Sequence, residues 1–132
     1  MMTTMITHTP AVTLYGIPNC STVKKARLWL DEQGVSVLFH DFKKQGAQPV
    51  LLKKWLEHHD WETLLNRKGT TWRQLGQDAQ AGVRDADSAA ALMSAHPSLI
   101  KRPVIEWRSG AVTVGFNADA LTPHLHEKRH PS

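Results

Sequence analysis

Two groups of residues in this chain have clear chemical potential: a lone cysteine, and an arginine that stands before a proline. Cys20, the only cysteine among 132 residues, lies in the stretch YGIPNCSTVKKA, directly before a run that predicts a helix. At the start of a helix, backbone N–H groups without partners and the positive end of the helix dipole favour a thiolate. Lys24 and Lys25 add positive charge nearby. The pattern predicts that the pKa of Cys20 lies below the ordinary thiol value of about 8.5.

The residues around Cys20 support this interpretation. Pro18 fixes the turn before the cysteine, and the backbone amides of the next three residues are expected to point toward its sulfur; these are Ser21, Thr22 and Val23. The alternative is a small buried hydrophobic residue, as unpaired cysteines often are. Polar Asn19 and Ser21 on either side of the cysteine argue against that alternative.

The second candidate is Arg102, which immediately precedes Pro103 in the stretch IKRPV. Proline has no N–H to give to a sheet, so it is tolerated as the first residue of a strand, and X-Pro bonds are where cis peptides arise. A cis bond here would present neighbouring backbone to an active site. The alternative is an ordinary proline at the head of a strand, next to a solvated arginine.

Composition indicates a single domain covering residues 1–132, with ends at 1–10 and 127–132 that we expect to be flexible. Hydrophobic residues make up 41% and charged residues 21%, as in ordinary globular proteins. One cysteine excludes an internal disulfide. The adjacent His58 and His59 would point in different directions on a helix and make a poor chelate, so we expect no metal.

Charge and hydropathy limit the expected partners and location. The net charge is +4, but lysines and arginines are scattered and form no block, so a nucleic-acid partner is not expected. The start MMTTMITHTP lacks the features of a signal peptide, and no apolar run is long enough to span a bilayer. We therefore expect a cytoplasmic protein that does not associate with membranes.

The order of expected elements predicts the fold. Residues 11–17 and 35–42 favour strands and flank a helix at 21–33, which predicts a βαβ unit with parallel strands and an exit loop at 43–46. Residues 49–97 favour several short helices, with a capping box at Thr71–Gln74 and a later helix capped by Asp87 or Ser88. PVIEW and AVTVGF predict a tight antiparallel hairpin. A last helix would begin at Asn117 or, as Pro123 favours, at Thr122.

This order predicts an α/β protein with a thioredoxin-like fold: a four-stranded mixed sheet covered by helices, with an all-helical insertion at about residues 49–97. Several segments then resemble the glutaredoxin-coupled arsenate reductase and Spx-like family, and above all its YffB-like branch. They are YGIPNCSTVKKARLWL, WETLLNRKGTTWRQL, DSAAALM, HPSLIKRPVI and VGF. The resemblance extends from about Val12 to Leu125, and it depends on the Pro-x-Cys loop and the late Arg-Pro occurring together.

The resemblance implies roles for individual residues. Cys20 matches the nucleophile, Arg102 an arginine that stabilises the thiolate or an oxyanion, and Pro103 a cis-proline. A guanidinium suits this role because it stays charged and donates two parallel N–H bonds. A second cation is expected between Asn66 and Lys68, where Arg67 is the choice. With glutathione as cosubstrate, the binding residues would be Pro18, Asn19, Ser21, Thr22, Arg67 and Pro103.

The sequence also departs from the family. Gly16 stands where the arsenate reductases have a histidine, and Gly115 stands where they have a third arginine; Ser21 and Val23 leave no second cysteine for an Spx-type switch. We therefore predict a glutathione-dependent monothiol oxidoreductase that forms a mixed disulfide and binds no resident cofactor, with glutathione or glutaredoxin as its partner. Two alternatives stay open: a non-enzymatic Spx-like adaptor that binds a protein such as RNA polymerase, and a true arsenate reductase.

Overall fold

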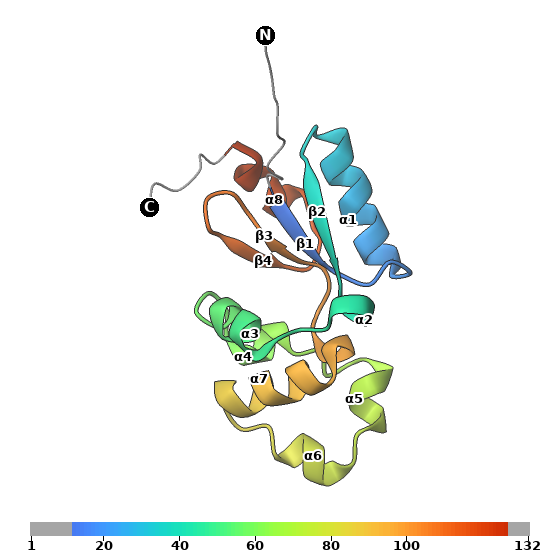
Figure 1. The fold of residues 1–132 in the computed structure, drawn as a ribbon, viewed down its shortest axis with the longest axis vertical. Helices are drawn as coiled ribbons and strands as arrows, with labels where there is room; N and C mark the ends of the chain where they lie inside the picture. Colours follow the sequence, from blue (N-terminus) through green and yellow to red (C-terminus); the bar gives the residue numbers. More distant parts are fainter. Residues whose placement is uncertain (1–11, 127–132) are drawn as a thin grey trace. The chain divides into compact units, whose positions relative to one another are not determined.

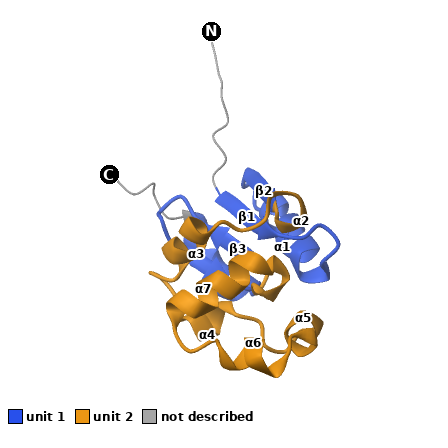
Figure 2. Ribbon diagram, turned by 60° about the horizontal axis from the view of Figure 1, so that its bottom comes forward, with its two compact units in different colours: residues 1–40, 103–132 blue, residues 41–102 orange. Residues whose placement is uncertain are grey.

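The computed structural model describes residues 12–126 of the chain (Figure 1). The expected flexible ends, 1–10 and 127–132, lie outside the described residues. The chain divides into two compact units, shown in different colours in Figure 2. The first consists of residues 1–40 and 103–132 and contains the sheet, and the second consists of residues 41–102 and is helical.

The first unit is built on a four-stranded sheet with the order β2-β1-β3-β4. The strands are β1 (Val12–Gly16), β2 (Val37–Asp41), β3 (Val104–Glu106) and β4 (Val112–Val114). β3 is antiparallel to both β1 and β4. The sheet is mixed, so β1 and β2 form its parallel pair, joined by helix α1 (Ser21–Glu32) as the βαβ pattern predicts. The predicted thioredoxin-like layout of this unit is therefore confirmed.

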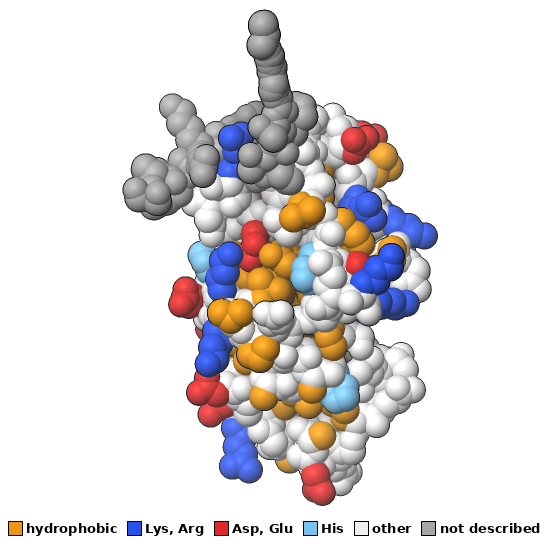
Figure 3. Space-filling model, viewed as in Figure 1, with side chains coloured by type: hydrophobic (Ala, Val, Ile, Leu, Met, Phe, Trp, Pro, Cys, Tyr) orange, Lys and Arg blue, Asp and Glu red, His pale blue; other side chains and the backbone are white. Residues whose placement is uncertain are grey.

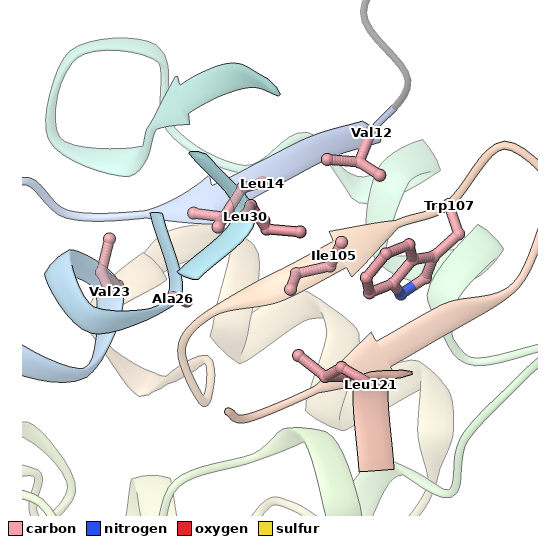
Figure 4. Close-up of a cluster of buried hydrophobic side chains, with 8 residues drawn as sticks. All are labelled: Val12, Leu14, Val23, Ala26, Leu30, Ile105, Trp107 and Leu121. Carbon is pink, nitrogen blue, oxygen red and sulfur yellow. The ribbon is translucent and has the colours of Figure 1, made fainter. Parts of the chain in front are cut away.

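One face of the sheet carries the core of the first unit. Leu14 of β1 lies opposite Ile105 of β3, and both contact the apolar side of α1. Helix α8 (Ala118–Leu121) adds Leu121 to the same cluster. Figure 4 shows its members, which are Val12, Leu14, Val23, Ala26, Leu30, Ile105, Trp107 and Leu121. Helices α1 and α8 therefore cover the same face of the sheet.

The opposite face of the sheet carries a buried tyrosine. The Tyr15 hydroxyl donates a hydrogen bond of 2.8 Å to the Glu106 carboxylate, and its ring lies 4.8 Å from that of His40. Burial raises the pKa of Tyr15 well above the ordinary value, and the hydrogen bond to Glu106 and the negative charge of Glu106 raise it further. Tyr15 is therefore held in its protonated form.

This shift predicts a loss of stability in alkali. Because the folded pKa is raised, the stabilising contribution of Tyr15 is complete below the unfolded value of about 10 and decreases as the pH rises beyond it. Tyr15 is the only tyrosine, so ultraviolet absorbance of the phenolate reports on it alone. We expect the native protein to titrate at higher pH than the chain unfolded in denaturant. Coincident titrations of the two states would contradict this.

The second unit contains the short helices. Its α-helices are α2 (Phe42–Gln45), α3 (Pro49–Trp55), α4 (Trp61–Leu64), α5 (Thr70–Gln74), α6 (Gln77–Ala81) and α7 (Ala86–Ala95), followed by the 3₁₀ helix η1 (Pro97–Leu99). α3 packs against α7, with Leu52 and Met93 fully buried. The Phe42 ring contacts the Trp55 indole edge-on at 6.3 Å. The predicted helical block is thus confirmed, and it extends beyond 49–97 to include α2.

Two predicted helix caps are wrong. α5 begins after Gly69 and has no side-chain cap, so the capping box expected at Thr71–Gln74 does not form. α7 is capped by Asp85 and not by Asp87 or Ser88; the Asp85 carboxylate accepts from the Ser88 amide at 2.8 Å. In both cases the helix begins earlier than expected, which moves the capping position.

Other boundaries differ in smaller ways. Phe42 begins α2 and does not continue the strand, because the Asp41 side chain caps this helix by accepting from the Lys43 amide. Helix α6 was not predicted. The predicted hairpin is confirmed, with Gly110 in its turn at a φ of 96°. The last α-helix is capped by Asn117, and Pro123 lies in the 3₁₀ helix η2 (Thr122–His126) that follows.

Candidate active site

Cys20 is the N-cap residue of α1, as its place in the sequence predicts. Its backbone is extended (φ −89°, ψ 125°), and its carbonyl accepts the first bond of the helix from the Lys24 amide at 3.0 Å. The turn before it is closed by a 3.3 Å bond from the Cys20 amide to the Ile17 carbonyl. The side chain is half-buried at the edge of the core cluster. The sulfur is therefore neither sealed in the core nor fully exposed.

The start of α1 is suited to an anion. No side-chain hydrogen bond caps this helix, and its first turn has no acidic residue. The first-turn amides, those of Ser21, Thr22 and Val23, have no intrahelical acceptor. Pro18, Asn19 and Ser21 are exposed beside the thiol, and Thr22 is partly exposed. A thiolate, or a small anion held near it, would meet N–H donors and the positive end of a twelve-residue helix.

Gly16 determines how closely α1 approaches β1. A Cβ atom at this position would lie 2.6 Å from Cγ2 of Val23, which is fully buried in α1. Only glycine therefore fits without a shift of the Val23 side chain. This close approach packs the first turn of α1 against the end of β1, and a histidine here, as in the arsenate reductases, would collide with Val23 as it is placed.

Pro103 lies at the same end of the sheet as the Cys20 loop. Tyr15 pairs with Val104, so the start of the antiparallel β3 is beside the end of β1, where the loop to Cys20 begins. Pro103 is buried, and its carbonyl accepts from the Gly115 amide at 2.8 Å. Gly115 has a φ of 87°, a conformation that other residues rarely adopt. The arginine of the arsenate reductases would be strained there.

The two predicted arginines belong to the second unit. The Arg102 guanidinium donates to the Ser98 carbonyl at 3.0 Å, and its Nε is buried with no hydrogen-bond partner among the described residues. Arg67 is exposed, 3.8 Å from the Glu62 carboxylate and with its guanidinium 5.6 Å from the centre of the Trp61 ring. Cys20 and Pro103 thus belong to the first unit, and Arg67 and Arg102 to the second.

Within the second unit, two segments that are distant in sequence are bonded together. Leu65 and Ile100 form an antiparallel bridge, flanked by bonds from Asn66 N–H to the Leu99 carbonyl (2.7 Å) and from Lys101 N–H to the Leu64 carbonyl (2.9 Å). This pairing anchors the backbone that leads to Arg67 and to Arg102. The sequence indicated both arginines but not the bridge, because isolated bridges have no periodic pattern.

Ser98 is a residue that the sequence interpretation missed. Its carbonyl holds Arg102, and its hydroxyl accepts a 3.2 Å hydrogen bond from the Thr71 hydroxyl. Thr71, assigned to a capping box from sequence, thus bonds to η1 instead. The only sequence signal at Ser98 is its position directly after Pro97, at the start of a helical turn. That position indicates a turn but does not indicate a contact with Arg102.

The fold and the cysteine together define a class of protein. The first unit combines a mixed four-stranded sheet with a cysteine at the start of its first helix and a proline at the head of β3. In the sequence, the helical unit lies between this cysteine and this proline. These features define a thioredoxin-like protein with an insertion. A model of the ArsC family matches residues 15–123. The chain belongs to the ArsC family.

Solved structures and characterised relatives agree with this assignment. The YFFB protein is 47% identical with a TM-score of 0.82, over 86% of this chain and 98% of that one. An arsenate reductase (ArsC) related protein from Brucella melitensis is 45% identical with a TM-score of 0.67, over 92% and 99%. The global transcriptional regulator Spx of Streptococcus mutans is 27% identical, over 86% of this chain and 82% of its own.

These similarities support two kinds of function: a thiol-based oxidoreductase or an Spx-like regulator. The predicted roles of individual residues stay predictions, because the similarities identify a family and not its chemistry in this chain. In the described part of the chain, every helix is too short or too polar to cross a bilayer.

Proposed function

We propose that the protein is a glutathione-dependent thiol–disulfide oxidoreductase that uses Cys20 as its single nucleophile. The observation that carries this proposal is the position of Cys20 at the uncapped start of α1, with its side chain at the surface edge of the core. A buried structural cysteine would not need that position. The chain offers no second cysteine, so the thiol that completes the reaction comes from another molecule.

The reaction proceeds by thiol–disulfide exchange. The Cys20 thiolate attacks one sulfur of a disulfide, the S–S bond breaks, and the other sulfur leaves as a thiolate and takes a proton from solvent. With oxidised glutathione the product is a mixed disulfide between Cys20 and one glutathione. A second thiol, from glutathione or glutaredoxin, then attacks this mixed disulfide and restores the Cys20 thiolate, so the exchange needs no resident cofactor.

Charged residues support binding of glutathione in this proposal. Glutathione carries two carboxylates and one ammonium group, and Arg67 and Arg102 would attract the carboxylates or stabilise the leaving thiolate. Further contacts would come from Pro18 and Asn19 before the cysteine, from Ser21 and Thr22 at the start of α1, and from Pro103. Nε of Arg102 is buried without a partner among the described residues, so this guanidinium has a hydrogen-bond donor that the described residues leave unused.

The test is the intact mass after incubation with oxidised glutathione. We expect the wild type to gain one glutathione and Cys20→Ser to gain none. Arg102→Ala should form the adduct about tenfold more slowly or worse, because a hydrogen bond to a charged group contributes about 1.5–3 kcal/mol. Arg108→Ala is the matched control: Arg108 is exposed in the β3–β4 turn, at the other end of the sheet from Cys20, and its loss should have no effect.

The possible outcomes test the role of Cys20 separately from that of Arg102. An adduct that forms on the wild type as slowly as on a free cysteine peptide would overturn the proposal. Equal rates for Arg102→Ala and Arg108→Ala would remove Arg102 from the site while leaving Cys20 in it.

The second candidate function is a regulator that binds a protein partner, favoured by the similarity to Spx. In that case the biological effect would survive Cys20→Ser and be lost on substitution of surface residues of the helical unit. Arsenate reduction is the weaker alternative, because a side chain at Gly16 would collide with Val23 and Gly115 has a positive φ. Arsenate turnover with glutathione and glutaredoxin would measure it directly.

A further inference from the structure

β2 is an edge strand of the sheet, and among residues 12–126 no strand pairs with the outer side of its backbone. The Val12 amide donates to the Ser36 carbonyl at 3.3 Å, so Ser36 faces β1. Successive residues of a strand alternate, and the backbone N–H and C=O groups of Val37 and Phe39 therefore point outward from the sheet. Such an edge is a template for pairing with another strand. β4, at the other edge, has only three residues.

Exposed apolar side chains gather at this edge. Leu38 of β2 is 55% exposed, and Leu28 of α1 is 60% exposed. Leu28 lines an open groove of about 500 Å³ between α1 and the segment that leads through β2. Its other lining residues include Arg27, Asp31, Val35, Val37 and Phe39. The two leucines lie on different faces of the sheet, because Phe39 next to Leu38 packs toward α1.

The charges on α1 are arranged against the preference of an isolated helix. Lys24, Lys25 and Arg27 occupy its N-terminal part, whereas Asp31 and Glu32 lie at its C-terminus. Figure 3 shows an acidic group at the top of the α1 side of the molecule and several basic groups below it, with one further acidic group among them. The helix dipole favours the opposite order. In a single chain this order of charges is therefore unfavourable.

Arg27 and Asp31 are the charged residues of the groove. The Arg27 guanidinium lies 4.2 Å from the centre of the Phe39 ring, above the edge strand. Asp31 is one helical turn further along and also lines the groove. Neither forms an ion pair with another described residue. The groove therefore presents one positive and one negative side chain next to an exposed leucine.

We propose that this edge pairs with the same edge of a second copy of the chain. A two-fold axis at Leu38 makes β2 antiparallel to its counterpart and places Val37 opposite Phe39 of the second copy. The outward N–H and C=O groups of these two pairs then exchange hydrogen bonds. The two sheets become one continuous sheet of eight strands, four from each copy. Leu38 meets its own counterpart in a non-hydrogen-bonded pair, where side chains are closest.

The same axis makes the two α1 helices antiparallel on one face of the joined sheet. Arg27 of each copy then faces Asp31 of the other, and the two Leu28 side chains lie between these pairs. The basic part of one helix meets the acidic part of its counterpart, so the charge order that is unfavourable in one chain becomes complementary in the pair. This register pairs the outward backbone groups of β2, covers the exposed leucines and places opposite charges together. The agreement of these three features favours a second copy over an unrelated partner.

The first test is the mass in solution, measured by light scattering over a range of concentrations. We expect the wild type to reach the mass of two chains, twice 14.8 kDa. Leu38→Lys should stay a monomer, because two like charges would meet at the axis. Val50→Lys is the matched control, since Val50 is 69% exposed on α3, and this variant should still dimerise. A wild type that stays monomeric, or a Leu38→Lys variant that dimerises, would overturn the proposal.

The second test uses the charges. Arg27→Glu leaves two acidic residues in the groove, and Asp31→Arg leaves two basic ones, so each variant alone should be mainly monomeric. Mixing the two variants in equal amounts should restore the mass of two chains. A mixture that stays monomeric while the wild type dimerises would show that α1 does not face its counterpart.

The third test reports the register and does not depend on the thiol chemistry of Cys20. In a Cys20→Ser background the only thiol is the one introduced. Leu38→Cys places two thiols at a cross-strand pair whose Cα atoms are about 4.5 Å apart, which a disulfide spans. Mild oxidation should link Leu38→Cys chains rapidly and Val50→Cys chains only by slow collision. Equal rates of linking would reject the proposed axis.

Discussion

In native protein, alkylation of Cys20 is expected to show a pH midpoint at least one unit below that of the same chain unfolded in denaturant. The physical reason is the start of α1, where first-turn amides without intrahelical acceptors and the helix dipole stabilise the thiolate relative to the thiol. Lys24 and Lys25 are exposed in the same region and contribute less, because solvent screens their charge. Unfolding removes the helix and leaves the covalent neighbours of Cys20 unchanged.

The midpoint of the pH profile is a better observable than the rate at neutral pH. A lower pKa increases the thiolate fraction, but it also reduces the intrinsic nucleophilicity of that thiolate, with a Brønsted coefficient of about 0.4–0.5. The two effects partly cancel in the rate and do not cancel in the midpoint. Iodoacetamide is uncharged and avoids attraction to nearby cations. Equal midpoints in the folded and unfolded chain would show that the helix does not activate Cys20.

The elements that form the sheet could be predicted because each has a strong local signal. The β-branched and aromatic residues of Val12–Gly16 indicate a strand, and the apolar stripe of Val23, Ala26 and Leu30 indicates a helix. Their order then limits the topology, since βαβ units are almost always right-handed and hairpins are antiparallel. The division into two compact units has no such local signal; the expectation of a single domain stays a prediction.

The misplaced caps and the missed helix have a common cause. Several residues between positions 69 and 88 are of types that favour helix N-caps, and local sequence alone does not decide between them. Asp85 prevails because its carboxylate accepts from the Ser88 amide and hydroxyl, which satisfies the first turn of α7. Helix α6 was missed because none of its residues is buried and it therefore has no apolar stripe.

The candidate site was predictable only in part. Cys20 was evident because a single cysteine beside a proline and a helix start is a local pattern. The placement of Pro103 beside the end of β1 depends on strand register, which follows from the predicted hairpin and sheet order but not from any residue alone. The contact between Arg102 and the Ser98 carbonyl depends on the pairing of residues 64–66 with 99–101, a long-range contact without sequence signature.

Replacing Leu30 by alanine is expected to lower the free energy of unfolding by about 2–5 kcal/mol. Leu30 is fully buried between α1 and the sheet, so its truncation leaves a cavity in a close-packed core. Leu28 is the matched control, because it is a leucine of the same helix that is 60% exposed. Leu28→Ala should change stability by no more than about 0.5 kcal/mol. Both values come from urea unfolding followed by circular dichroism.

The comparison isolates packing from helix propensity. Both substitutions replace leucine by alanine inside α1, so the small gain in helix propensity is shared, and only the burial differs. The measurement belongs at a protein concentration at which the chain is monomeric, because Leu28 lies in the proposed interface between two copies. Equal losses for the two variants would contradict the packing of α1 through Leu30. A large loss for Leu30 alone would support it, together with the position of Cys20 that this packing fixes.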